Sequence, residues 1–269
     1  MRIALGIEYD GCAFAGWQTQ PHGNTVQDVL EQALAVIAGT SISTVAAGRT
    51  DAGVHAMMQV VHFDVDVSRP LTAWVRGVNA LLPKSLAVLW AQDIDPLFHA
   101  RFSACARSYS YFLLMHPVRP ALLNGKVGWF HRTLDVRAMR EAAVYLIGNH
   151  DFSSFRASEC QARSPVKHLQ RLAIECDGAW LRFDFTADAF LHHMVRNIMG
   201  ALIYVGKGAL TSQEMATLLA ARDRRTAPPT FMPDGLYLTH VRYPEQYALP
   251  SQVDTVRLMM WREYYGATN

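Results

Sequence analysis

The segment Gly48-Arg49-Thr50-Asp51-Ala52-Gly53-Val54-His55 places an acid, an arginine and two glycines close together. Glycine permits backbone angles and close approaches that a Cβ atom would forbid, so this segment can form a tight loop. A carboxylate beside a fixed guanidinium stays ionised at neutral pH, because the opposite charge favours the charged form. Asp51 beside Arg49 would therefore suit nucleophilic chemistry. The same residues also fit an ordinary turn between two strands, with Arg49 in solvent.

Tyr109 is a second candidate, in the predicted strand Ala106 to Met115. It shares a strand face with Tyr111 and Leu113, a pattern typical of burial. The alternative is a tyrosine whose ring lies against a nucleobase and whose hydroxyl is near the reacting carbon. The basic residue Arg107 on the same strand leaves that alternative open.

A third candidate segment contains His192, His193 and Arg196, in a predicted helix from His192 to Val205. Adjacent residues on a helix point about 100° apart, so two such histidines cannot easily bind one ion. We therefore predict no metal site. Arg196 lies near the helix start after an apolar strand, and burying an arginine without a carboxylate is costly. It is predicted to be a buried ion-pair partner.

Basic and aromatic residues also gather in predicted loops. Arg101 lies in the segment from Phe98 to Phe102, and Arg156 ends the segment from His150. Such loops could hold phosphates, although exposed charges are often simply solvated. The chain has no Walker loop and no GxGxxG motif, so the sequence gives no support for ATP or dinucleotide cofactors.

The composition predicts a soluble, cytoplasmic protein with a substantial core. Of 269 residues, 51% are hydrophobic and 18% are charged, a composition typical of a folded rather than a disordered chain. The chain contains no apolar run of about 18 residues, and its first residues resemble a strand more than a signal peptide. Its 4 cysteines are far apart in sequence and form no CxxC motif, so neither a disulfide framework nor a zinc site is expected.

The formal net charge of +2 is unevenly distributed. Residues 1–100 carry 5 Lys and Arg against 9 Asp and Glu, whereas the remaining residues carry 20 against 14. The two parts therefore have formal charges of −4 and +6, and the basic excess in the second part is compatible with a polyanionic partner.

The elements that must position these residues follow a recognisable order. Hydrophobic periodicity predicts β-α-β-β-α-β over the first hundred residues, which is the ferredoxin-like arrangement, and similar elements follow in the second part. We predict an α+β protein of two ferredoxin-like (RRM-like) halves, residues 1–105 and 106–245, followed by a tail of residues 246–269. The halves would share a mostly antiparallel sheet with a central cleft.

Seven blocks in this order resemble the TruA-type tRNA pseudouridine synthases. They are Glu8 to Gly11 with Gly16-Trp17-Gln18, Gly48 to His55, Phe98 to Phe102, Arg107-Ser108-Tyr109, Asp151 to Arg156, His192 to Asn197 and Gly235 to Leu238. They span nearly the whole chain, and the block around Asp51 is highly specific. The resemblance does not extend to the last residues, from Arg257 to Asn269.

The resemblance implies a pseudouridine synthase fold, no cofactor, a homodimer and a tRNA substrate modified at uridines 38 to 40 of the anticodon stem-loop. Asp51 would be the nucleophile, Tyr109 the residue stacked on the target uracil, and Arg196 the ion-pair partner of Asp51. Substrate-binding roles would fall to other residues in the matching blocks: Arg49, which would help hold a flipped nucleotide, His55, Arg101, Arg107, Arg156 and Leu236.

Two other classes of function must be distinguished from this one. A non-catalytic RNA-binding module of the same fold would bind tRNA without needing Asp51. A nucleoside hydrolase would release free uracil, but the sequence offers neither a second obvious carboxylate nor a metal cluster for it.

Overall fold

A computed structural model describes residues 1–21 and 23–250 of the chain. It is an α+β fold built on one large, mostly antiparallel sheet, as predicted. The longer strands are β1 (Arg2–Tyr9), β3 (His55–Asp64), β4 (Leu86–Ile94), β5 (Ala106–Met115), β7 (Gly148–Asp151), β8 (Val166–Asp177), β9 (Trp180–Ala187) and β10 (Leu236–Arg242). They lie side by side in the order β4-β1-β3-β10-β5-β9-β8-β7. The short strands β2 (Val45–Ala46) and β6 (Gly128–Phe130) pair with β3 and β5.

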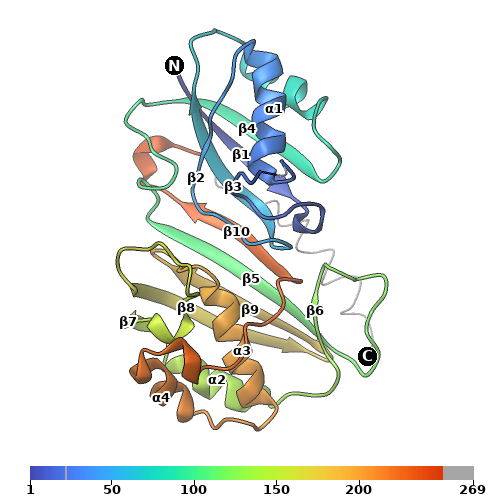
Figure 1. The fold of residues 1–269 in the computed structure, drawn as a ribbon, viewed down its shortest axis with the longest axis vertical. Helices are drawn as coiled ribbons and strands as arrows, with labels where there is room; N and C mark the ends of the chain where they lie inside the picture. Colours follow the sequence, from blue (N-terminus) through green and yellow to red (C-terminus); the bar gives the residue numbers. More distant parts are fainter. Residues whose placement is uncertain (22, 251–269) are drawn as a thin grey trace.

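The helices lie over the two ends of this sheet (Figure 1). Helix α1 (Val26–Ala38) lies near β1 and β4, whereas α2 (Val136–Val144), α3 (Met194–Gly206) and α4 (Glu214–Ala221) gather near β7, β8 and β9. The Thr25 side chain caps the start of α1, and Gly39 ends that helix in the left-handed conformation, as its sequence predicts. Asp135 caps α2 in the same way. Within the described residues, no helix has both the length and the apolar character needed to cross a membrane.

The last strand joins the early and late parts of the chain. Strand β10 pairs in parallel with β3, with Tyr237 opposite His55, and antiparallel with β5, with Leu238 opposite Tyr109. It thereby brings the loop before β3 next to strand β5 (Figure 1). Because one sheet runs through both parts, the proposed division into two ferredoxin-like halves at residue 105 stays a prediction. Residues 251–269 of the predicted tail lie outside the described residues.

Two local predictions were wrong. Helix α3 begins at Met194, so His192 and His193 precede it. His150 and Asp151 belong to strand β7, not to a loop. The structure also buries a polar residue of β3: His62 is 4% exposed because loop residues 98–100 cover it.

Candidate active site

Asp51 lies in the loop between β2 and β3, and hydrogen bonds hold this loop at two residues just before Asp51. The hydroxyl groups of Tyr9 and Thr50 share a buried hydrogen bond of 2.8 Å. The side-chain amide of Gln59 donates to the Gly48 carbonyl at 2.6 Å. The backbone that carries the Asp51 carboxylate is therefore fixed in place.

Two glycines allow this loop its shape. Gly53 has a φ of 80°, which is the left-handed region that a Cβ atom disfavours. Gly16 has a φ of 93°, and a Cβ atom there would lie 3.0 Å from the Thr50 carbonyl oxygen. Because Gly16 has no Cβ atom, its loop can pack directly against the backbone around Asp51.

The predicted ion pair between Asp51 and Arg196 is present. Nη1 of Arg196 donates to Oδ2 of Asp51 at 2.9 Å, across 145 residues of sequence. Nε of Arg196 donates to the Phe231 carbonyl at 3.0 Å, so the guanidinium itself is anchored. The two side chains are only 15% and 17% exposed, which strengthens their attraction relative to a pair at the surface.

Two histidines also face the Asp51 carboxylate. Nε2 of His192 lies 3.4 Å from Oδ1, and Nε2 of His193 lies 3.4 Å from Oδ2. Sequence analysis placed both on a helix with diverging side chains. They instead occupy the turn before α3, and His193 has a φ of 61°, which directs the two rings to the same acid. Their position immediately ahead of the apolar helical pattern was the signal available in the sequence.

These donors keep Asp51 ionised. Burial raises the pKa of the Asp51 carboxyl, but hydrogen bonds from His192 and Arg196 outweigh burial, and the net pKa lies below its usual value. Arg49 was expected to supply this effect from the same loop. Its side chain is exposed, and no ion pair between Arg49 and Asp51 occurs among the described residues. The stabilising charge comes from Arg196 instead.

Tyr109 lies beside the same loop. A Cβ atom added to Gly48 would be 4.0 Å from the Tyr109 hydroxyl, and the Phe190 ring meets the Tyr109 ring edge-on at 5.0 Å. Tyr109 is 8% exposed and belongs to the hydrophobic core. Burial, followed by the nearby Tyr9 and Asp51 oxygens, raises the pKa of its hydroxyl, which is therefore protonated at neutral pH.

Arg107, to which the resemblance assigns a substrate-binding role, is held by backbone groups of this chain. Its guanidinium donates to four backbone carbonyls: those of Ala47, Arg101, Ala104 and Asp188. The side chain is 9% exposed. Its contacts fasten the segment leading to Asp51 to two other loops, so this placement favours a role in holding the site together.

The other predicted basic residues differ in their freedom to meet a ligand. Arg49 and Arg101 are exposed, and Arg101 lies over the exposed ring of Phe102 at 5.5 Å. Arg49 is in the Asp51 loop itself. Arg107 donates to the carbonyls of both Ala47 and Arg101, so the segment that carries Arg101 lies beside the start of this loop. Arg156 is half-buried and donates to the carbonyls of its own loop at Cys160 and Ala162.

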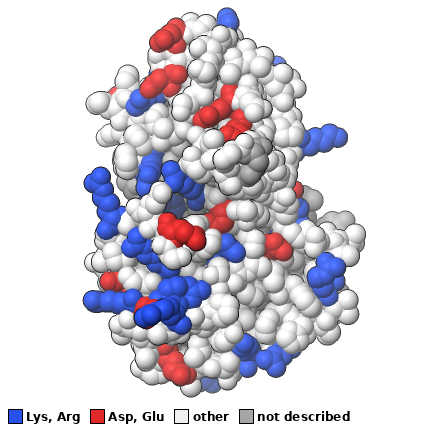
Figure 2. Space-filling view, in the orientation of Figure 1, with Lys and Arg blue, Asp and Glu red and all other residues white. Residues whose placement is uncertain are grey.

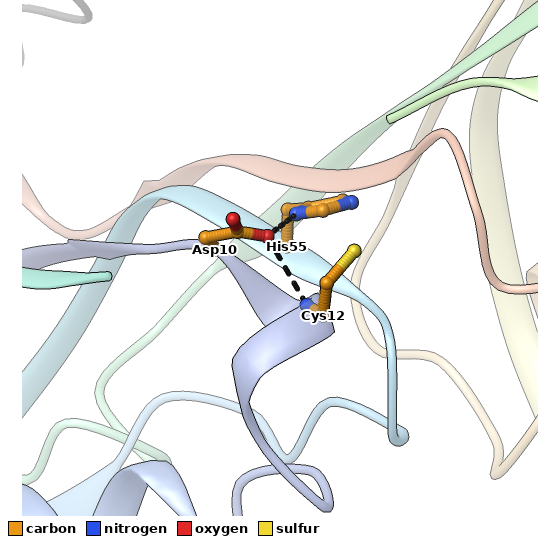
Figure 3. A group of neighbouring side chains, drawn as sticks. All are labelled: Asp10, Cys12 and His55. Atoms are coloured by element: carbon orange, nitrogen blue, oxygen red, sulfur yellow. Dashed lines mark hydrogen bonds and ion pairs between the residues drawn. The ribbon is translucent and has the colours of Figure 1, made fainter. Parts of the chain in front are cut away.

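His55 lies in a different cluster from Asp51 (Figure 3). It is 2% exposed, its Nδ1 accepts from the Gly11 N–H at 3.0 Å, and its Nε2 donates to the Gly125 carbonyl at 2.8 Å. Burial lowers the pKa of His55, which is consistent with this neutral form. Leu236, also predicted to bind substrate, is 4% exposed in β10. Both placements favour structural roles.

Two groups of described residues have donor atoms close enough to hold a metal ion. They are Asp10, Cys12 and His55, and the group of Asp51, His192 and His193. In each group a protein cation already contacts the carboxylate: Lys126 pairs with Asp10, and Arg196 pairs with Asp51. Neither carboxylate therefore needs an ion to balance its charge.

A hollow of about 460 Å³ adjoins the group of side chains around Asp51. His193 forms part of its wall and connects it to Asp51. The remaining wall mixes apolar residues with two arginines and one acid: Ala157, Ser158, Glu159, Arg224, Arg225, Ala227, Pro229 and Thr230. This lining would suit a ligand that carries both negative charge and hydrogen-bonding groups.

A family model described as tRNA pseudouridine synthase matches residues 6–103 and 142–244, which include Asp51, Arg196 and both histidines. The chain belongs to this family. Pseudouridine synthases are isomerases that convert uridine to pseudouridine, so the chain is an enzyme of that class. The matched segments include the Asp51 loop, the start of α3 and the exposed segment around Arg101.

Relatives of the enzyme match over nearly the whole chain. A protein from Chromobacterium violaceum named tRNA pseudouridine synthase A is 72% identical over 262 residues, which cover 97% of this chain and 100% of the relative. A protein of the same name from Burkholderia mallei is 57% identical over 270 residues, with 100% of both chains covered. The crystal structure of a Cbf5-Nop10-Gar1 complex matches 98% of this chain and 57% of that chain, at a TM-score of 0.37 and 11% identity. That similarity is too low to support a conclusion about this chain.

Proposed function

We propose that this enzyme isomerises uridines 38 to 40 in the anticodon stem-loop of tRNA, with Asp51 as the nucleophile. The observation that carries the proposal is the ion pair between Asp51 and Arg196, with Nη1 and Oδ2 2.9 Å apart. It keeps a carboxylate ionised at a position where the side chain is 17% exposed. An inert RNA-binding surface would have no need for an acid held in this way.

The reaction requires three changes in the nucleoside. The N1–C1′ bond breaks, the uracil ring turns, and a C5–C1′ bond forms before the proton on C5 is lost. The Asp51 carboxylate can attack C1′ and be displaced from it when the C5–C1′ bond forms. Alternatively, it can add to C6 of the ring. In either route Asp51 forms a covalent bond to the nucleoside. Because no water is activated, a second carboxylate of the kind that glycosidases use is unnecessary.

Tyr109 would confine the detached ring while it turns. Its ring is held edge-on by Phe190, and its hydroxyl lies near Gly48 at the start of the Asp51 loop. A rigid aromatic wall favours stacking against uracil, and the partly apolar surroundings would limit access of water to an intermediate. The protonated hydroxyl could also donate a hydrogen bond to the ring.

A paired or stacked uridine must leave its stack to reach Asp51, at a cost of a few kcal/mol. Contacts with phosphates would offset this cost. Basic side chains gather over the middle and lower left of the face in Figure 2, and Arg49, Arg101, Arg222 and Arg225 are exposed. We propose that these arginines hold the tRNA backbone and that Arg49 holds the flipped nucleotide.

We also propose that the enzyme is a cytoplasmic homodimer. Light scattering would test the oligomeric state, and cell fractionation would test the localisation.

The test is to incubate the purified enzyme with tRNA that carries uridine at positions 38 to 40 and to analyse the nucleosides. We expect pseudouridine at those positions and no free uracil. Free uracil would instead indicate a hydrolase, and bound but unchanged tRNA would indicate a binding module. Pseudouridine at other positions alone would contradict the proposed substrate.

A further inference from the structure

The carboxylate of Asp51 is contacted at both of its oxygens. Arg196 and His193 face Oδ2, whereas His192 alone among the described residues faces Oδ1, with Nε2 at 3.4 Å. An ion pair at one oxygen leaves a carboxylate free to turn about its terminal torsion, whose energy wells are broad. A donor near the second oxygen, here 3.4 Å away, would limit that rotation.

The chain holds His192 in this position through its backbone. The His192 N–H donates to Sγ of Cys160 at 3.4 Å, and the His192 carbonyl accepts from the Ala157 N–H at 3.0 Å. The next residue, His193, has a φ of 61°, and its side chain makes no capping hydrogen bond to α3. A left-handed backbone at a residue other than glycine is strained and persists where the surroundings require it. Here it places both rings, whose centres are 4.0 Å apart, toward one acid.

The charges around the two histidines differ. The hydrogen bond with Asp51, and then its charge, raise the pKa of His192 above its ordinary value, and Glu159 and Cys160 act in the same direction. Burial lowers the pKa of His193; the Asp51 charge opposes this, but the charges of His192 and Arg196 add to the lowering, and the net pKa lies below the ordinary value. His192 is therefore the histidine that can carry a charge beside Asp51 near neutral pH, while His193 stays neutral.

We propose that His192 is a positioning residue for Asp51: its Nε2–H holds Oδ1 in the empty enzyme and releases it to the incoming nucleotide. The proposal rests on the proposed function, since it assigns His192 a task in the same reaction. His192 is 40% exposed, more than Asp51 or Arg196, so it is the donor that a substrate can most readily displace. A doubly protonated imidazole would hold Oδ1 more strongly and compete with the substrate.

The test compares His192→Ala and His192→Gln with the wild type, using single-turnover rates and tRNA affinity from pH 5.5 to 8.5 (a range of about one to two pH units around the ordinary histidine pKa). Glutamine keeps a neutral N–H donor at similar reach, but it does not titrate. We expect His192→Ala to lower the rate by about 10- to 100-fold, because a misplaced nucleophile reacts slowly, with tRNA affinity changed by less than about threefold. We expect His192→Gln to recover most of the rate and to remove the loss of rate at acid pH. His131→Gln, at an exposed histidine outside the site, is the control.

A second measurement does not depend on turnover. The titration of the His192 ring, followed by NMR, should have a pKa above that of an exposed histidine in the wild type and should shift downward in Asp51→Asn. If the wild type formed no pseudouridine while this shift occurred, the proposed function would fail but the contact would stand. An unchanged His192 pKa in Asp51→Asn, or a wild-type rate for His192→Ala at every pH, would overturn the positioning role. A His192→Gln rate as low as that of His192→Ala would also overturn it, provided that both variants melt at the wild-type temperature.

Discussion

At the scale of single residues, the site depends on a carboxylate and a guanidinium from opposite parts of the chain. Arg196 makes two hydrogen bonds in different directions, one to the Phe231 carbonyl and one to Asp51. A lysine has one nitrogen and cannot reproduce this pair of contacts. Without Arg196, the Asp51 carboxylate would be largely buried and would lack its charge partner. We expect the pKa of Asp51 to rise and its side chain to be held less firmly.

We therefore predict that Arg196→Met lowers the single-turnover rate by about 100-fold or more, as expected for an unpaired buried charge worth roughly 3 kcal/mol or more. Rates and affinities for tRNA should be measured together. Arg225→Met is a suitable comparison, because Arg225 is 90% exposed and pairs with Asp223 at the surface. That variant should lose tRNA affinity at most. Equal rates for Arg196→Met and the wild type would contradict the account.

Sequence reasoning identified Asp51, Tyr109 and Arg196, but it did so largely through an ordered resemblance. Local pattern alone gave Asp51 the wrong charge partner, because neighbours in sequence need not point at each other in a loop. It also did not predict that both histidines face Asp51. The divergence of their side chains was inferred for a helix that starts at His192, whereas α3 starts two residues later. His55 and Arg107 have buried partners that no spacing in the sequence could reveal.

At the scale of elements, Arg107 links the loops around the site through its hydrogen bonds. Its four carbonyl partners come from the end of β2, the segment before β5 and the turn after β9. A buried arginine without a carboxylate was expected to be costly, but carbonyl oxygens satisfy this guanidinium instead. Burial lowers the pKa of Arg107, but an arginine remains charged at any ordinary pH.

We predict that Arg107→Met reduces the free energy of unfolding by about 2–4 kcal/mol, because it leaves buried carbonyls without donors. Urea denaturation measures this loss, and Arg107→Lys should recover part of it. Arg137→Met is the matched control, since Arg137 is 90% exposed and pairs with Glu141 of its own helix. A loss for Arg107→Met no larger than that of the control would show that these hydrogen bonds are unimportant.

Most elements followed from hydrophobic periodicity and from capping residues. The N-caps Thr25 and Asp135, the hairpin between β8 and β9, and the last strand are where these signals place them. Periodicity failed where tertiary contacts decide the outcome. His62 alternates with apolar residues along β3, and a loop from about 36 residues later buries it, a contact that lies outside any local window.

At the scale of the whole molecule, one sheet joins the acidic early part of the chain to its basic later part. The β10 strand lies between β3 and β5, so the Asp51 loop and the start of α3 meet only when the chain is fully folded. The order of strands could not be predicted from the elements, because it depends on a strand near the end of the chain entering the middle of the sheet. Activity and global stability should therefore be closely linked.

Buried histidines make that stability depend on pH. Burial, followed by the charge of Arg2, lowers the pKa of His62 to about 4, and its Nδ1 accepts from the Ala100 N–H at 3.1 Å. The pKa values of His55, His99, His193 and His240 are also lowered, in each case chiefly by burial. The unfolded chain therefore takes up protons at a higher pH than the folded chain does. The stability from these neutral histidines is present above the ordinary histidine pKa of about 6.5 and is lost as the pH falls.

We predict that the urea midpoint of the wild type falls steadily between about pH 6.5 and pH 4. His62→Asn keeps an acceptor near the position of Nδ1 but does not titrate, so its midpoint should fall less steeply over the same range. His131→Asn, at an exposed histidine, should follow the wild type. A His62→Asn midpoint that falls as steeply as the wild-type midpoint would show that His62 titrates normally in the folded protein.

The central claim is that the Asp51 carboxylate is the nucleophile, and the most direct measurement is the single-turnover conversion of tRNA by Asp51→Asn. The amide has nearly the same shape and can still contact its neighbours, but it cannot attack carbon as an anion. We predict that tRNA affinity stays within about threefold of the wild type, since the phosphate contacts are unchanged, while no pseudouridine forms. Pseudouridine formed by a clean preparation of Asp51→Asn, at a rate within about tenfold of the wild-type rate, would contradict the account.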